Sequence, residues 1–595
     1  MAPTRTLVVS ARAETVTDAA AYGLSPLTLS DRLGRVLRNA WTQRILSVVV
    51  VFALWQIFGN QFTTSVPSLI FQQAFSQSFA TDVIPAFGQT LATFGTGFAI
   101  CIVAGVPIGL AMARVRVVRV ILEPYVNTFY SLPMVSLLPV LLLAFGIGFP
   151  LRVAATVLFG IFAVIVNTYI GASSIDPALE DTAKVFVASP GKRLTTVILP
   201  ASLNYIFAGI RIAFGHGMIG AVVIELEASA IGVGFQLSTD ASELRFDKFW
   251  VVVFVLGIFS IIAGVIMRRT ERTFTEPWTR PAWMRRHPEA TSVATTGSAL
   301  TPRAAAPAPS RTSAASAAGG SAFAPVARGF EVFGHAINRL IRKRWGAVTL
   351  QIVVLLILLT AWQIGSTSVS RAVLPSPISV AIEIYNQTIV TGSIFAPLWQ
   401  SVSLLVVGFI VAVVLGVIIG LAMGQFRWIN NVLDPYVSFL YALPHAVFIP
   451  ILVVWLGFGF PFGLGYVVIS AIFPVLINAM QSVRTMKQEY PDLARSFNAS
   501  RWQTTRTIIW PHSIPYIATG IRLAFSVSWI AVIVSEVLSS EQGLGGLITS
   551  YGNQYRTADM FVPVIFITVI SVVILQLSTR LQPRLAPWAP SSLGK

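Results

Sequence analysis

Charged residues, cysteine and histidine are scarce in this chain. Only 11% of its 595 residues are Asp, Glu, Lys or Arg, 55% are hydrophobic, and the mean hydropathy is +0.75. A soluble protein of this length needs far more charge to cover its surface. The single cysteine, Cys101, lies in an apolar run and has no second cysteine for an internal disulfide. The composition therefore excludes a soluble or disulfide-stapled protein.

Two functional motifs are also missing. The first 30 residues contain no apolar core of the signal-peptide type, so residues 1–40 are expected to be a cytosolic tail. No G-x-x-x-x-G-K-[ST] motif occurs, because "PGKR" at 190–193 lacks both the upstream glycine and the hydroxyl residue. We expect no ATP hydrolysis, no catalytic residue and no cofactor in this chain. His445 has no second histidine or acidic residue at helical spacing, so no metal site is expected.

Acidic residues are outnumbered by basic ones, 24 to 41, and the net charge is +17. Such a balance can indicate nucleic-acid binding. Here many Lys and Arg residues cluster beside apolar runs, which indicates a lipid bilayer and no nucleic acid. The positive-inside rule then places both termini and the segments 174–199 and 485–510 in the cytoplasm.

Apolar runs of about 20 residues, the length that crosses a bilayer, predict twelve spanning helices. A shift of 311 residues superimposes two sets of six, with no insertion from Gly105/Gly416 to Gly234/Gly545. Both sets begin on the same side, so the sequence predicts an all-α integral membrane protein built from two parallel six-helix repeats. "GVPIG" at 105–109 and "GVIIG" at 416–420 are predicted helix-packing sites. The expected spans are 44–61, 87–113, 125–147, 152–173, 200–228 and 249–267, then 347–365, 398–424, 436–458, 462–482, 512–538 and 560–579.

A stretch rich in Ala, Pro, Ser and Thr, from about 286 to 326, separates the repeats. This composition does not bury a core, so it predicts a flexible tether. The expected division is an N-terminal tail at 1–40, a first membrane domain at 41–272, a cytosolic linker at 273–336, a second membrane domain at 337–585 and a C-terminal tail at 586–595.

The most specific pattern is the predicted cytosolic loop between the fourth and fifth helices of each repeat. Asp176-Pro177 has the form of an N-cap followed by proline in the first turn, and Ser189-Pro190 repeats it. Ser500 stands at the place that matches Ser189. Each loop therefore predicts two short helices, which suit the docking of a soluble partner better than an ordinary solvated loop does.

These loops resemble the signature of permease subunits of bacterial binding-protein-dependent ABC importers, which has Glu-Ala-Ala, then a Gly after three residues, then a Leu-Pro. Strings such as "VLPSP" at 373–377 and "SEVLSSEQGLGGLI" at 535–548 resemble the nitrate, sulfonate and taurine group. Val187 and Asn498 replace the family's glycine, and Asn tolerates a left-handed backbone better than Val does. The copy-two loop is therefore expected to dock in the more usual way. The matched positions are Asp181, Thr182, Ala183, Ser189 and Pro200, and Asp492, Leu493, Ala494, Ser500 and Pro511.

The resemblance implies a type I importer permease fold in the bacterial inner membrane. It also implies two copies of a cytosolic ATP-binding subunit, which bind the ATP and Mg²⁺, and an extracytoplasmic solute-binding protein. The two halves would rock about a pseudo-twofold axis to give alternating access. The substrate that it suggests is a small solute, namely a sulfonate, nitrate, taurine or a similar organic anion, although related permeases carry neutral or cationic vitamin precursors.

Polar residues inside the predicted spans are candidates for a pathway or gate, because charges in a bilayer are costly. Glu225 and Glu536 lie toward the outer ends of the fifth helices, and the alternative is that each anchors that helix. Pro133 and Pro444 are expected to break the third helices, where freed carbonyls line a cavity or a kink simply packs. Further candidates are Arg211, Arg522, Asn127 and His445.

Two other functions compete with the importer permease. A passive channel or an ion-coupled transporter would need no ATPase and no docking loops. A membrane scaffold or sensor would need a folded soluble output domain, and the sequence indicates none.

Overall fold

The computed structural model describes residues 39–59, 64–186, 189–228, 230–279, 346–368, 370, 373–539 and 543–585. These residues form α-, 3₁₀- and π-helices, with no strand among them. The predicted N-terminal tail up to residue 38, the C-terminal tail and residues 280–345 of the linker region lie outside the described part. Helix α13 continues to Thr279, past the predicted domain boundary at 272.

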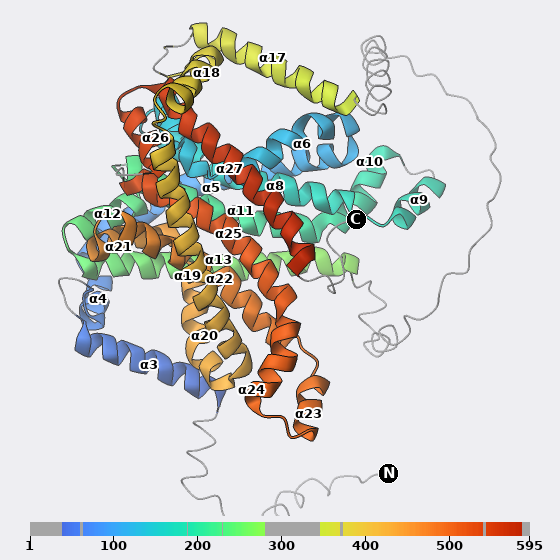
Figure 1. Ribbon diagram of the computed structural model, residues 1–595. Helices are drawn as coiled ribbons and strands as arrows, with labels where there is room; N and C mark the ends of the chain where they lie inside the picture. Colours follow the sequence, from blue (N-terminus) through green and yellow to red (C-terminus); the bar gives the residue numbers. More distant parts are fainter. Residues whose placement is uncertain are drawn as a thin grey trace, which may run out of the picture.

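The first repeat runs from α3 to α13 (Figure 1). Its elements are α3 (Ala40–Phe58), α4 (Pro67–Ala74), η1 (Phe79–Val83), α5 (Ile84–Arg114), α6 (Arg116–Ser131), η2 (Met134–Leu137), α7 (Leu138–Phe145), α8 (Phe149–Ser173), α9 (Pro177–Val185), α10 (Pro190–Arg193), η3 (Leu194–Ile198), α11 (Leu199–Ala228), α12 (Val233–Ser242) and α13 (Phe246–Thr279).

The second repeat follows the same order. Its elements are α17 (Gly346–Ser368), α18 (Pro377–Tyr385), η4 (Asn386–Val390), α19 (Phe395–Gln425), α20 (Arg427–Ala442), η5 (His445–Phe448), α21 (Ile449–Leu456), α22 (Phe460–Arg484), α23 (Glu489–Ser496), α24 (Arg501–Thr504), η6 (Thr505–Ile509), α25 (Trp510–Ser539), α26 (Gly543–Asn553) and α27 (Thr557–Leu585).

Ten helices in the described residues are long and apolar enough to cross a membrane. The third predicted span of each repeat is not one helix, because α6 and η2–α7 are bent by 100° and α20 and η5–α21 by 98°. The bends follow Leu132-Pro133 and Leu443-Pro444, as expected from the loss of an amide donor at proline. Counting each bent pair as one span gives the twelve predicted helices, and the repeats are parallel as expected.

The long helices of each repeat pack closely at glycine. A Cβ on Gly109 of α5 would lie 2.7 Å from the Ile165 carbonyl oxygen of α8. A Cβ on Gly420 of α19 would lie 2.4 Å from the Leu476 oxygen of α22. Both distances are shorter than any side chain tolerates, so glycine is required there. The predicted packing role of the two glycine motifs is confirmed.

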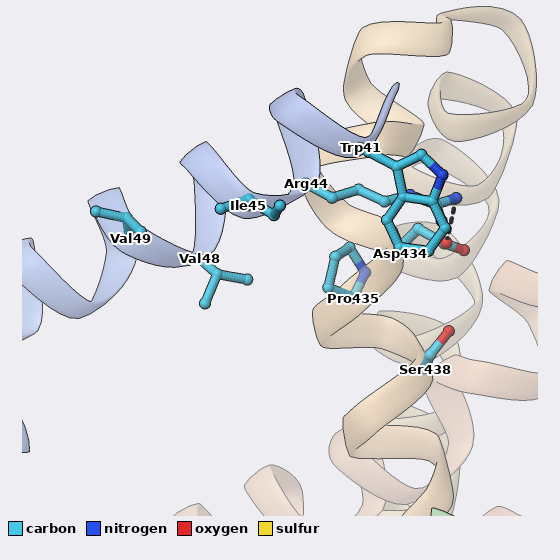
Figure 2. A pocket seen from close by; sticks show the side chains of 8 residues that line it. All are labelled: Trp41, Arg44, Ile45, Val48, Val49, Asp434, Pro435 and Ser438. Atoms are coloured by element: carbon cyan, nitrogen blue, oxygen red, sulfur yellow. Dashed lines mark ion pairs between the residues drawn. The ribbon is translucent and has the colours of Figure 1, made fainter. Parts of the chain in front are cut away.

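Each repeat holds the first helix of the other. Helix α3 packs on α20, where Arg44 forms an ion pair with Asp434 at 2.9 Å (Figure 2). Asn431 of α20 also donates to Gln43 of α3 at 2.7 Å. A cavity of about 430 Å³ beside this ion pair is lined mainly by apolar groups of the two helices. Helix α17 packs on α6, where Gln351 donates to the Val120 carbonyl at 3.2 Å. The first helix of each repeat thus packs on the other repeat, and we call these two contacts, α3 on α20 and α17 on α6, the clasps.

The bundle has two unlike ends. We call the end that carries α9, α10, α23 and α24 the loop end, and the end that carries α12 and α26 the hairpin end. At the loop end the two pairs of short helices project in different directions, whereas α12, α21 and α26 gather on the left of Figure 1. Contacts between the repeats join α12 to α21, α26 to α7, η2 to α25 and η5 to α11. Their buried side chains form one shared apolar core, so the repeats meet at the hairpin half and diverge at the loop end.

Candidate functional site

The loop of the second repeat is a pair of short helices with a sharply defined turn. Helix α23 is followed, after Phe497, by Asn498 in the left-handed region with a φ of 56°. The Ala499 amide donates to the Ala494 carbonyl at 3.0 Å, and the Asn498 amide donates to the Arg495 carbonyl at 2.9 Å. This is a Schellman motif, in which asparagine serves the position that glycine usually takes. The left-handed backbone expected at Asn498 is confirmed.

A capping box then begins α24. The Ser500 hydroxyl accepts from the Gln503 amide, while the Gln503 side chain accepts from the Ser500 amide at 2.8 Å. The π-turn η6 joins α24 to the long helix α25, which begins at Trp510-Pro511. The predicted N-cap role of Ser500 is therefore visible in the structure, and the short helix is rigidly continuous with a long membrane helix.

The loop of the first repeat is capped differently. Asp176 accepts from the Ala178 amide at 2.9 Å, as predicted, but Ser189 receives only a 3.4 Å bond from the Lys192 amide. The π-turn η3 joins α10 to α11, matching η6 in the second repeat. The turn at Val187 lies outside the described residues, so its predicted departure from the usual backbone path stays a prediction.

Both loops expose large apolar side chains. Phe186 and Phe497, which are equivalent under the 311-residue shift, are 80% and 78% exposed. Leu179 and Tyr490, also equivalent, are about half exposed. Ala183 and Ala494 are instead buried, at 8% and 6% exposure, against their own loops. Exposed apolar groups at matched positions in two loops indicate surfaces that a partner covers.

The remaining loop residues from the sequence analysis lie around these surfaces. Asp492 pairs with Arg495 at 3.1 Å on the surface of α23. Thr182 donates to the Ala178 carbonyl, and Asp181 lies exposed on the same helix, α9. Leu493 is exposed, whereas Pro200 is half-buried near the start of α11.

The helix break of the second repeat places His445 at the start of a 3₁₀-turn, η5, that contacts α11 of the first repeat. Pro133 and Pro444 are buried, and each precedes a 3₁₀-turn. The His445 ring stacks on Phe473 with centroids 5.8 Å apart, and its Nε2 has no hydrogen-bond partner among the described residues. Met134 occupies the equivalent place in the first repeat. Asn127 lies exposed on α6, away from any described side-chain partner.

The arginine and the glutamate singled out on each fifth helix lie in different surroundings. Arg211 pairs with Glu271 of α13 near the loop end and is about half exposed. Arg522 occupies the equivalent position of α25 and is half-buried. Glu225 and Glu536 lie buried at the hairpin end. The structure therefore does not bring the arginines and the glutamates of one helix together.

Each buried glutamate fastens three helices at the hairpin end. The Thr90 hydroxyl of α5 lies 2.8 Å from a Glu225 carboxylate oxygen, which also accepts from the Gly234 amide of α12 at 3.0 Å. In the second repeat, Ser401 donates to Glu536 at 2.8 Å, and the Gly545 amide donates to it at 2.9 Å. The hydroxyl in turn accepts an amide bond at 2.9 Å from Val233 in one repeat and Leu544 in the other. We call each set of contacts a glutamate latch.

The latches differ in one charge. Arg152 of α8 lies with its Nη1 3.7 Å from a Glu225 oxygen, and its side chain is buried. The equivalent residue of the second repeat is Gly463. Sequence analysis missed Arg152, Thr90 and Ser401. The 311-residue shift could have found the hydroxyl pair, because it superimposes Thr90 on Ser401.

The segments that follow the latches also carry different polar networks. In the first repeat, Asp240 of α12 accepts from Gln236 at 3.0 Å and pairs with Arg245 at 3.2 Å. Burial raises the pKa of Asp240 to about 6, against the opposing effect of Gln236 and Arg245. In the second repeat Tyr551 replaces this aspartate, and Arg556 lies over its ring, 4.9 Å from the centroid.

Comparison with known proteins identifies the family of this chain. The model of the family "Binding-protein-dependent transport system inner membrane component" matches residues 105–276 and 412–589, which together make up more than half of the chain. The chain belongs to this family. One match falls in each repeat, so this permease is a tandem of two family domains, and each match includes one loop and the glutamate of one latch.

Curated relatives each correspond to a single repeat. The chain is 30% identical to the taurine transport system permease protein of Escherichia coli (strain K12) over 42% of its own length and 94% of that protein. It is 27% identical to a putative aliphatic sulfonates transport permease protein of Bacillus subtilis (strain 168), over 42% and 92%. It is 30% identical to a bicarbonate transport system permease protein of Synechococcus elongatus, over 39% and 87%. This permease is therefore a non-enzymatic, multi-pass component of transport at the inner membrane.

Proposed function

We propose that this permease forms the complete membrane pathway of an ATP-driven importer for a small solute that carries an oxoanion group, such as a sulfonate, nitrate or taurine. Two copies of a cytosolic ATP-binding subunit would dock on the two loops and would bind the ATP and Mg²⁺. A solute-binding protein would deliver the substrate at the hairpin end, with both termini of the chain in the cytoplasm.

The exposed side chains of Phe186 and Phe497 are the main support for this proposal. They project from the loops at matched positions, and each loop continues through a π-turn into a long helix that reaches a glutamate latch. A partner that grips both phenylalanines could move α11 and α25 as levers. Because the repeats meet at the hairpin half and diverge at the loop end, the conformation corresponds to the inward-facing state of alternating access.

The substrate class is supported by what the relatives transport. The printed names of the three relatives above concern taurine, aliphatic sulfonates and bicarbonate, all of which carry an oxoanion. A further relative, a riboflavin transport system permease protein of Chloroflexus aurantiacus, is 27% identical, so the family also includes a permease for an uncharged vitamin. An oxoanion group is the feature that most of these named substrates share.

The test is to purify the chain gently from its native membrane and measure co-eluting proteins by quantitative mass spectrometry. We expect two ATP-binding subunits per chain. Replacing both Phe186 and Phe497 with alanine should reduce the copurified ATPase at least tenfold and abolish ATP-dependent uptake, without changing the amount of chain in the membrane, since both side chains are exposed. Ala183→Arg with Ala494→Arg should have the same effect by disrupting the loops.

The matched control is Ala80→Arg, at an exposed alanine near the start of α5 at the hairpin end. This variant should retain the ATPase and the uptake. A chain that elutes without ATPase, and whose transport is indifferent to both loop variants, would instead support an ATP-independent channel or a secondary transporter.

A further inference from the structure

Arg152 is a buried cation with unused hydrogen-bond donors. It lies in the first turn of α8 and is 5% exposed. Neither its Nε nor its Nη1 has a hydrogen-bond partner among the described residues. Burying a guanidinium without satisfying its N–H groups is costly. A cation in the first turn of a helix also opposes the helix dipole, and α8 has no acidic residue there to offset it.

Glu225 accounts for only part of this arrangement. Its carboxylate lies 3.7 Å from Nη1, which is close enough for charge attraction and too far for a hydrogen bond. The carboxylate oxygens already accept from Thr90 at 2.8–2.9 Å and from the Gly234 amide at 3.0 Å. The guanidinium therefore retains N–H donors that Glu225 does not satisfy.

The second repeat is an internal control for the role of Arg152. Its latch has the same geometry, with Ser401, Glu536 and the Gly545 amide in equivalent places. Gly463 stands where Arg152 would be, and a Cβ there would lie 2.7 Å from Leu404, so no larger side chain fits without a shift. A glutamate latch thus forms without a cation at this position, and holding the latch together does not explain Arg152.

We propose that Arg152 is an anion-binding residue of the first repeat alone, whose Nε and Nη1 donate to the oxoanion of the transported solute at the hairpin end. This rests on the proposed function. A guanidinium donates to the planar or tetrahedral oxygens of carboxylate, nitrate and sulfonate groups more strongly than to neutral acceptors. Arg152 is covered in the present conformation, so the oxoanion reaches it when the hairpin end opens. A single cation on one side of the pseudo-twofold axis orients the solute.

The experiment uses the complex copurified from the native membrane, reconstituted in lipid nanodiscs. Its melting temperature is titrated with sodium nitrate, taurine, sodium ethanesulfonate and sodium bicarbonate, against sodium chloride at equal ionic strength. One arm contains ATP and orthovanadate, which trap closed ATPase subunits, and the other contains no nucleotide. We expect at least one of the four probes to raise the melting temperature saturably, with a lower midpoint concentration in the trapped arm.

Three variants assign the effect to this guanidinium. Arg152→Gln should raise the midpoint at least tenfold, and Arg152→Lys, which keeps the charge beside Glu225 but offers one nitrogen, should give an intermediate value. Arg245→Gln is the matched control, because it removes an equal charge from the same repeat at a residue that pairs with Asp240. Its midpoint should equal that of the wild type. If Arg152→Gln does not fold, the comparison of Arg152→Lys with Arg245→Gln decides.

The proposal is overturned if no probe shifts the wild-type complex in either arm, if the Arg152 variants respond as the wild type does, or if Arg245→Gln loses the response equally. The proposed function fails separately, because its readout is ATPase copurification and loop-dependent uptake. An ATP-driven importer whose anion response ignores Arg152 would keep that function and lose this inference.

Discussion

The two repeats share a helix order, a clasp and a glutamate latch, but they distribute charge differently. At the hairpin end, the first repeat surrounds Glu225 with Thr90 and Arg152, whereas the second gives Glu536 a serine and places Gly463 at the cation's position. At the loop end the second repeat has the stronger serine cap, because Ser500 forms a capping box whereas Ser189 accepts a single 3.4 Å bond. Fusion of the repeats in one chain allows them to diverge, since each position is encoded twice.

The largest contrast concerns the two latch glutamates. Glu225→Gln would leave the buried guanidinium of Arg152 without its counter-charge, and we expect the free energy of unfolding to fall by about 3 kcal/mol. Glu536→Gln keeps an acceptor for Ser401 and Gly545, so we expect the free energy of unfolding to fall by only about 1 kcal/mol. Denaturant unfolding of the full chain in detergent micelles measures both. Combining Arg152→Gln with Glu225→Gln should recover much of the loss, and equal losses for the two single variants would remove the contrast.

The next largest effect on stability is expected at the turn of Asn498. Valine at a φ of 56° is expected to cost about 1–2 kcal/mol, because a β-branched side chain clashes in the left-handed region. Asn498→Val should therefore accelerate hydrogen exchange in 489–509 about tenfold or more, while Asn498→Gly preserves protection. Val187→Gly in the first repeat should not slow exchange if that loop follows a different path. Slower exchange there would show that both loops need the same turn.

The effects on stability of removing the two serine N-caps should differ by a smaller amount. Ser500→Ala removes both bonds of the capping box and is expected to destabilise α24 by about 1 kcal/mol. Ser189→Ala removes a single 3.4 Å bond and should cost less than half of that. Hydrogen exchange at Gln503 and Lys192 reports the two caps separately. Equal effects would mean that the first loop is as well capped as the second.

The smallest effect is expected at the clasps. Arg44 and Asp434 are both partly exposed, with side chains about one third and one quarter accessible, so Arg44→Gln should cost at most about 1 kcal/mol. Gln351→Ala removes one neutral bond from the other clasp and should cost no more. Melting temperatures at low and high salt distinguish the two, because only the first should depend on ionic strength.

Local signals in the sequence anticipated several parts of the site. Proline predicted the broken third helices, and Asn498 and Ser500 predicted the turn and cap of the second loop, since these depend on backbone preferences within a few residues. The polar residues that the sequence singled out were less informative. Arg211 pairs with a helix sixty residues away, and the partners of Glu225 lie on α5 and α12. Periodicity indicates that a glutamate is buried and says nothing of what faces it.

The sequence by itself determined the membrane class, the two parallel repeats, the number of spans and the presence of paired loops. Hydropathy and capping signals depend on neighbouring residues, and the constant 311-residue shift is visible by comparing the two halves of the sequence, so none of these requires knowledge of the fold. Only the tertiary structure decided that α3 and α17 are exchanged between repeats, that a hydroxyl 135 residues away holds Glu225, and that Arg152 lies beside it with donors to spare. These contacts join distant segments, and packing alone selects which polar groups meet inside an apolar bundle.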